Sequence, residues 1–263
     1  MRKTFESGHA KNVAQLEDLI SYCGSLGNDF NPPKSDLTLQ GLKDYLVQAQ
    51  AVIVSTHTAF AAYKNAISER EAAFRTLSKH TTRIINALHY SGTTSQLYQN
   101  ARTIVRKIQG STLKSKNVDL LPENGNQSLQ NTDTAATNPS DQTAEAIVHS
   151  SRQMSFDLRL DNFNKLIILL TGLPEYNPNE SDLKISELTT RYADMHAKNS
   201  AAVNAYIVLT NSRLQRNNFL YKEDSGLVAL AMSIKFYIKS VFGGTSPQYK
   251  QISGLKFNNG GLI

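Results

Sequence analysis

The residues best able to hold a metal ion are histidines and carboxylates spaced along predicted helices. Carboxylate-bridged sites in helical bundles need Glu-x-x-His on two helices, and Glu6-Ser7-Gly8-His9 is the one match in the sequence. Glu145 and His149 are four residues apart, a spacing that suits a solvated pair equally well. The zincin pattern His-Glu-x-x-His does not occur. We therefore expect no metal site and no cofactor.

Residues for nucleophilic catalysis or phosphate binding form no known pattern either. The single cysteine, Cys23, falls on an apolar helical face, where a core thiol is the expected role. The sequence contains no Gly-x-Ser-x-Gly elbow and no glycine-rich phosphate loop. His57 and His196, inside predicted long helices, have no matching histidine in the other half of the chain. We expect no catalytic residue and no enzymatic activity.

Cations alternate with aromatic rings near the C-terminus, in the segment 235–239. Single-strand nucleic-acid binders use such groups. At helical spacing, however, Tyr237 and Val241 are predicted to face the core. Lys235 and Lys239 are predicted to share a solvated side. We favour the structural interpretation.

The elements that must position these residues come from an internal repeat. Residues 31–37 match residues 177–183, which begin 146 positions later, and the register continues without gaps from Leu42/Leu188 to Arg70/Arg216. Further matches lie upstream, at Leu16/Phe163 for example, and downstream, at Gly92/Gly243. We interpret this as a tandem duplication. The predicted organisation is a helical repeat at 1–110, a flexible polar linker at 111–150 and a second repeat at 151–263.

Apolar periodicity in both halves is helical. One long helix in each half has apolar residues spaced by seven, which is typical of coiled-coil packing; in the first half they begin with Leu42 and Ala49. Shorter helices precede and follow it, and Gly92 and Gly243 are expected to end the third helix of each half. The predicted fold is all-α, with two tandem antiparallel bundles of three to four helices each.

Two polar pairs are matched inside the long helices. They are Asn65 with Asn211, and Arg70 with Arg216. They are candidates for an interaction groove or, as we prefer, for hydrogen bonding that fixes the register of the long helices.

Charge is spread thinly along the chain. Residues 1–110 hold 13 Lys and Arg against 8 Asp and Glu, and residues 151–263 hold 13 against 9. A mild positive surplus favours anionic partners only where cations cluster, and the densest group is Arg102, Arg106 and Lys107. No run of apolar residues is long enough to cross a membrane, and no secretory signal is recognised. We expect a cytoplasmic protein by default.

Three sequence blocks carry a family resemblance. They are 3–14, 159–166 and the segment 237–251. With them the chain resembles an uncharacterised, internally duplicated, all-helical family of Bacteroidota-type bacteria. The resemblance implies a bacterial, all-helical protein, and it assigns no activity, ligand or functional residue.

The function that these observations favour is a non-enzymatic helical scaffold. It would bind an unknown protein partner or self-associate through exposed faces of the long helices. The alternative is an anion-binding module for nucleic acid or phospholipid surfaces that uses the mildly basic bundles. No small-molecule substrate is indicated.

Overall fold

The computed structural model describes residues 7–110 and 155–259. Within these ranges the chain forms helices and turns and no strand, which confirms the all-α prediction. Glu6, Glu145, His149 and the predicted linker 111–150 lie outside the described residues.

The first half of the chain forms four α-helices and two short 3-10 turns. The first of these turns, η1, spans Gly27–Asp29. The other elements are α1 (Ser7–Ser25), η2 (Ser35–Leu37), α2 (Leu39–Arg75), α3 (Leu77–Tyr90) and α4 (Ser95–Gln109). The predicted stop after α3 is confirmed, because Gly92 has a φ of 84°, a left-handed conformation that favours glycine. Thr94 then begins α4 as an N-cap, its side chain accepting from Leu97 N.

The second half shows a corresponding order of elements. They are α6 (Phe156–Thr171), η3 (Ser181–Leu183), α7 (Ile185–Tyr221), α8 (Leu227–Phe242) and α9 (Pro247–Ser253). The long helices α2 and α7 both have 37 residues. Gly243, with a φ of 87°, follows α8 as Gly92 follows α3.

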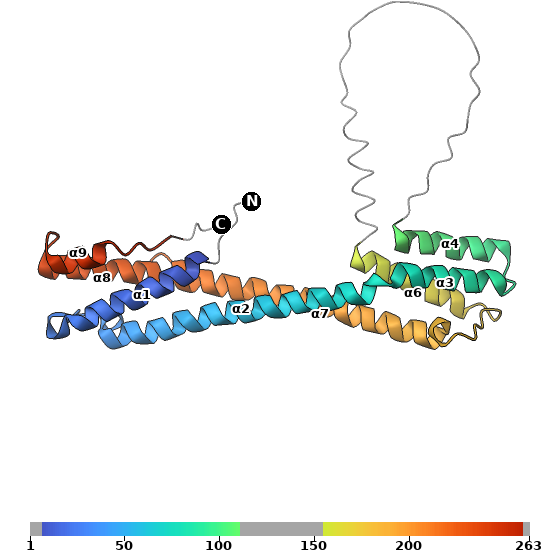
Figure 1. Ribbon diagram of the computed structural model, residues 1–263, viewed down its shortest axis with the longest axis horizontal. Helices are drawn as coiled ribbons and strands as arrows, with labels where there is room; N and C mark the ends of the chain where they lie inside the picture. Colours follow the sequence, from blue (N-terminus) through green and yellow to red (C-terminus); the bar gives the residue numbers. More distant parts are fainter. Residues whose placement is uncertain (1–6, 111–154, 260–263) are drawn as a thin grey trace, which may run out of the picture. The chain divides into compact units, whose positions relative to one another are not determined.

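Each of two compact units is built from both halves of the chain. Unit 1 comprises Met1–Ile67 and Ala202–Ile263, and unit 2 comprises Ser68–Ala201. In Figure 1, unit 1 therefore combines α1 and the start of α2 with the end of α7, α8 and α9. Unit 2 combines the end of α2, α3 and α4 with α6 and the start of α7. The compact units thus differ from the predicted repeats 1–110 and 151–263.

Helix length gives the physical reason for this difference. At 1.5 Å per residue, a helix of 37 residues is about 55 Å long, whereas the 19 residues of α1 span about 28 Å. A single short helix therefore covers only part of a long helix. The helix before α2 lies with its start in unit 1 and the hairpin after α2 lies with its end in unit 2, and in each unit helices from the other half complete the core.

The core of unit 1 is apolar and joins the two halves. Its buried residues from the first half lie on α1, at Phe30 just after η1, and on η2 and α2, and those from the second half lie on α7, α8 and α9. They are Val13, Leu16, Leu19, Ile20, Cys23, Phe30, Leu37, Leu42, Ala49, Leu220, Leu227, Ala231, Ile234, Ile238 and Ile252.

The core of unit 2 is assembled in the same way. It draws on α2, α3 and α4 from the first half and on the segment from α6 to α7 in the second. Its largest fully buried side chains include Phe74, Leu77, Leu88, Phe163 and Leu166. Ile168, on α6 beside Leu166, is 64% exposed and marks the outer face of that helix.

Two sequence predictions for α8 are wrong. Lys235 is 9% exposed rather than solvated, and Val241 is 50% exposed rather than part of the core. The buried residues of α8 include Leu227, Ala231, Ile234 and Ile238, whose helical stripe also contains position 235. The Lys235 ammonium reaches past the core and donates to the Leu255 carbonyl oxygen at 2.5 Å, so only its aliphatic stem packs inside.

Candidate functional site

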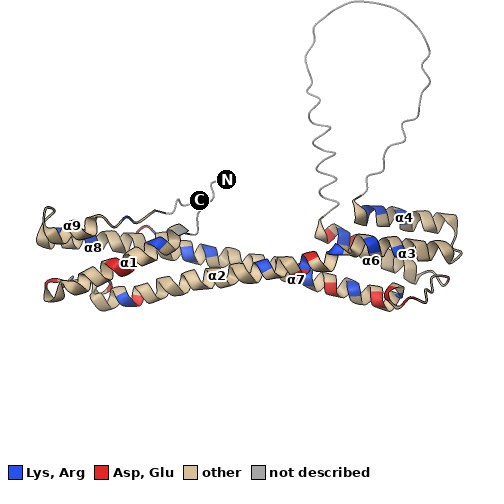
Figure 2. Ribbon diagram, viewed as in Figure 1, with Lys and Arg blue, Asp and Glu red and all other residues tan. Residues whose placement is uncertain are grey.

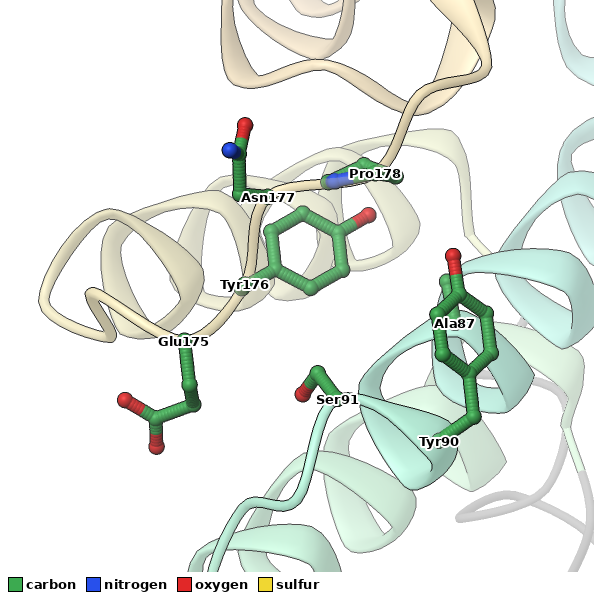
Figure 3. Close-up of a pocket in the computed structure, with 7 residues that line it drawn as sticks. All are labelled: Ala87, Tyr90, Ser91, Glu175, Tyr176, Asn177 and Pro178. Carbon is green, nitrogen blue, oxygen red and sulfur yellow. The ribbon is translucent and has the colours of Figure 1, made fainter.

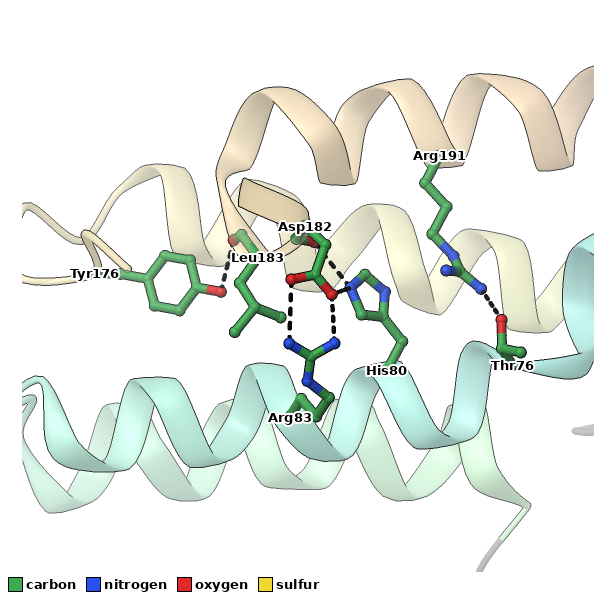
Figure 4. A network of polar contacts seen from close by, with 7 residues as sticks. All are labelled: Thr76, His80, Arg83, Tyr176, Asp182, Leu183 and Arg191. Atoms are coloured by element: carbon green, nitrogen blue, oxygen red, sulfur yellow. Dashed lines mark hydrogen bonds and ion pairs between the residues drawn. The ribbon is translucent and has the colours of Figure 1, made fainter. Parts of the chain in front are cut away.

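A polar network of unit 2 surrounds Asp182 in η3 (Figure 4). Two guanidinium nitrogens of Arg83 donate to its two carboxylate oxygens, one of them at 3.1 Å. This bidentate contact holds the pKa of Asp182 below its usual value. Both side chains are about half exposed, so water screens the pair.

His80 lies beside this ion pair (Figure 4) and is buried. Its Nε2 is 2.9 Å from the Asp182 carbonyl oxygen. A carbonyl only accepts, so Nε2 carries the proton. Burial lowers the pKa of His80 and favours the neutral ring. Among the described residues, no hydrogen-bond partner is found for its buried Nδ1.

Positions that the predicted repeat aligns join the halves by different chemistry. In unit 2, Arg191 near the start of α7 donates to Thr76 Oγ1, between α2 and α3, at 2.7 Å (Figure 4). In unit 1 the corresponding residue of α2 is Tyr45, whose hydroxyl donates to the carbonyl oxygens of Phe219 and Ser225 at 2.8 and 3.1 Å. Burial raises the pKa of Tyr45 to about 12. Both contacts are structural.

A small pocket of about 140 Å³ lies between the end of α3 and the segment before η3 (Figure 3). It is lined by Ala87, Tyr90, Ser91, Glu175, Tyr176, Asn177 and Pro178. Tyr176 donates its hydroxyl to the Leu183 carbonyl oxygen, and Glu175 accepts from Thr93. The volume is below the range of about 300–1,000 Å³ for ligand sites. With the polar groups of Tyr176 and Glu175 already engaged, the pocket is better suited to water than to a substrate.

Of the predicted polar residues, Arg70 lies in unit 2. Its guanidinium is 4.1 Å from the centre of the Phe156 ring and 3.5 Å from Asn199 Oδ1. The amide nitrogen of Asn199 donates to Asp157 at 2.7 Å. Arg70 therefore connects α2 to α6 and α7, which come from the other half of the chain.

The other three predicted polar residues lie in unit 1. Arg216 is 5% exposed and donates to Asn217 Oδ1 through Nε and Nη2. Asn65 and Asn211 are exposed. The structure therefore places Arg70 and Arg216 in different units and at half-buried or buried positions, while both asparagines face outward.

The remaining candidates for chemistry are not gathered into a site. Cys23 is buried as predicted, and burial raises the pKa of its thiol to about 12, far from the thiolate form. His57, His89 and His196 are exposed. In the parts of the chain that the structure describes, no group of three or more His, Cys, Asp or Glu could hold a metal ion.

In unit 1 the segments of α2 and α7 run antiparallel. The Tyr45 ring stacks on Phe219 at 4.5 Å, and the rings of Tyr63 and Tyr206 are 5.5 Å apart. As residue numbers rise along α2, those of the partner residues fall along α7. Several of the buried side chains along these segments are small, among them Ala49, Ala59 and Ala202.

The outer surface of these same segments is uncharged and partly apolar. No Lys, Arg, Asp or Glu occurs at 45–63 or at 199–212, and Figure 2 shows these stretches of α2 and α7 without charged positions. Val203, Ile207 and Leu214 are 46%, 50% and 56% exposed. Their spacing of four and seven places them on one face of α7. We call them, with Tyr206 at 52%, the α7 outer face.

This outer face was not identified by the sequence patterns. Val203 and Tyr206 also fit the apolar periodicity that predicts a buried helix. The available signal is the absence of charge on every side of the helix at 199–212, because a helix with one solvated face normally carries charges there.

Comparison with known proteins finds no protein-family model, no curated protein and no solved structure that matches this chain. The resemblance to a Bacteroidota-type family therefore stays a prediction. Among the helices of residues 7–110 and 155–259, none has the length and apolar character to span a membrane.

Proposed function

We propose that the protein is a non-enzymatic helical scaffold that binds another protein through the α7 outer face. The observation that carries this proposal is the exposure of Val203 and Ile207 on the segment 199–212, which has no Lys, Arg, Asp or Glu, with Leu214 exposed on the same face just beyond it. Exposed apolar residues that line one helix face favour contact with a partner's apolar surface.

The partner that fits this face is an amphipathic helix with an uncharged apolar side. A charged partner face would lose hydration at α7 without finding an opposite charge at 199–212. Tyr206 adds an aromatic ring with a polar end, which suits a surface that is wet when free and covered when bound.

The same proposal includes an internal duplication with coiled-coil packing between the long helices. Leu188, Met195, Ala202, Leu209 and Arg216 are all buried and recur every seven residues. The equal lengths of α2 and α7, and the similar order of elements around them, support this interpretation.

Photo-crosslinking tests the binding surface. A photoreactive amino acid at Ile207 is expected to give a specific crosslink in cells, to another protein or to a second copy. The control is the same substitution at Ile168, an isoleucine that is also well exposed but lies on α6. Equal labelling from the two positions would contradict the proposal.

Binding to the crosslinked partner then provides the second test. Ile207→Glu is expected to weaken binding by about 10-fold or more, because it buries a charge against an apolar face. Ile168→Glu should leave the affinity unchanged within about twofold. Circular dichroism should show the same helix content for both variants.

The anion-binding alternative has less support. Arg83, Lys165 and Lys198 each lie within ion-pair distance of a carboxylate, so their charge is partly neutralised. The group Arg102, Arg106 and Lys107 on α4 is small. Binding to DNA, RNA or anionic vesicles at low salt, lost steeply as salt is raised, would favour the alternative.

A further inference from the structure

The two halves of the chain depend on each other for their cores. In unit 1, α1 and η2 from the first half contact α8 from the second. In unit 2, α4 from the first half packs against α6 from the second. Contacts inside one half include the hairpins of α3 with α4 and of α8 with α9. A half by itself would therefore retain a long helix and hairpins but neither complete core.

Specific side chains make the same connection. In unit 2, the Phe74 ring of α2 meets the Phe156 ring of α6 edge to face at 4.9 Å. The Arg159 guanidinium of α6 donates to the Phe74 carbonyl oxygen. In unit 1, Asn12 of α1 exchanges two hydrogen bonds of 2.9 Å with the backbone of Asn258. The halves are therefore joined by specific ring contacts and hydrogen bonds in addition to apolar burial.

We propose that residues 7–110 and 155–259 are non-covalent binding partners, and that their association does not require a continuous chain between them. The partner that each half fits is defined by its elements: a short helix, a 3-10 turn, a 37-residue helix and a helical hairpin. The other half of the same chain provides them, and a second copy provides the same surfaces. This inference rests on the composition of the units and is independent of the α7 outer face.

Apolar burial provides the affinity. Separation of the halves would expose Leu16 and Leu19 of α1 together with Leu227 and Ile234 of α8, all 0% exposed in the full chain. It would also expose Leu166 of α6, likewise fully buried. Because both cores open together, dissociation is coupled to loss of tertiary structure, as in obligate dimers.

Cleavage of the full-length protein tests the proposal. A protease site inserted after residue 130 leaves both halves intact, and the protein is cleaved after it has folded. The two fragments are expected to elute together at micromolar concentration, with the summed mass and with unchanged helix content. After denaturation and dilution they should form the same species. Separate elution of the fragments, with or without loss of helix, would overturn the proposal.

A matched pair of variants locates the association at the shared core. In the cleaved protein, Leu166→Ala is expected to raise the dissociation constant about 30-fold or more, since it leaves a cavity where α6 is buried. Ile168→Ala, on the exposed side of the same helix, should change it less than about threefold. Equal effects of the two substitutions would contradict association through this core.

Discussion

The two units have corresponding helices but differ in how polar their helix contacts are. Alignment of Leu77 with Leu227, both fully buried at the start of α3 and α8, places Leu230 opposite His80 and Ser233 opposite Arg83. Asp36 of η2 corresponds to Asp182 of η3. Asp182 accepts from Arg83, whereas Asp36 accepts from its neighbour Ser35.

This difference shows that the apolar packing of a unit does not depend on the polar contacts between its helices. Unit 1 has a leucine on α8 where unit 2 has a buried histidine on α3, and both units still form an apolar core across the two halves. We call the buried apolar contacts that both units form across the two halves the frame. The network around Asp182 is an addition to this frame. Disruption of the frame should have the largest effects, and disruption of the network smaller ones.

The largest effect is expected at the equivalent leucines of the frame. Leu77→Ala and Leu227→Ala should each destabilise the protein by about 2–5 kcal/mol, because each leaves a cavity in a fully buried site. Denaturant unfolding followed by circular dichroism measures both. A loss below about 1 kcal/mol in only one variant would show that the units do not share the same frame.

A smaller effect is expected where the halves join. Tyr45→Phe should cost about 0.5–1.5 kcal/mol through the loss of the hydroxyl contact to Phe219 and Ser225. Arg191→Met should cost less, because it also removes a buried Nε for which the described residues provide no hydrogen-bond partner. A larger loss for Arg191→Met in the same unfolding assay would reverse this ranking.

The pH dependence should distinguish the units next. Burial lowers the folded-state pKa of His80 below its ordinary value of 6.5, so the unfolded chain binds more protons near and below that pH. Stability should therefore fall as the pH falls from 7 to 5. His80→Leu, which introduces the residue type found in unit 1, should weaken this dependence. An unchanged slope of unfolding free energy against pH would contradict the role of His80.

The smallest effect is expected at the exposed ion pair. Asp182→Asn should lower the melting temperature slightly at low salt, through loss of the contact with Arg83, and have little effect at 1 M salt. Asp36→Asn is the matched control and should leave the melting temperature unchanged at both salt concentrations. The same shift in both variants would remove the proposed difference between η2 and η3.

Local features of this fold could be predicted from the sequence. That each compact unit combines helices from both halves of the chain could not be predicted. Glycines after α3 and α8 and the seven-residue spacing in α7 determine where helices end and which face is buried. Spacing does not identify the partner helix, and Leu42 or Leu188 would be equally buried against either half. A lysine on a helix predicts a solvated position, but Lys235 is buried because its long aliphatic stem crosses the core to a carbonyl.

The candidate site was predicted only in part. The predicted repeat points to Arg70 and Arg216, but Asn199 and Asp157, which complete the Arg70 contacts, have no counterpart of the same type in that alignment. The sequence predicts exposed faces on the long helices as binding surfaces, but its periodicity does not identify the residues of the α7 outer face. Their exposure depends on how few helices cover that segment, which periodicity does not report.

The central claim is that each unit contains helices from both halves of one chain. The most direct test is nuclear Overhauser spectroscopy on the protein with selectively labelled aromatic rings. The account predicts cross-peaks between Phe74 and Phe156 and between Tyr45 and Phe219, whose ring centres are 4.9 and 4.5 Å apart. Absence of both cross-peaks, with ring contacts found only inside residues 7–110 or inside 155–259, would contradict it.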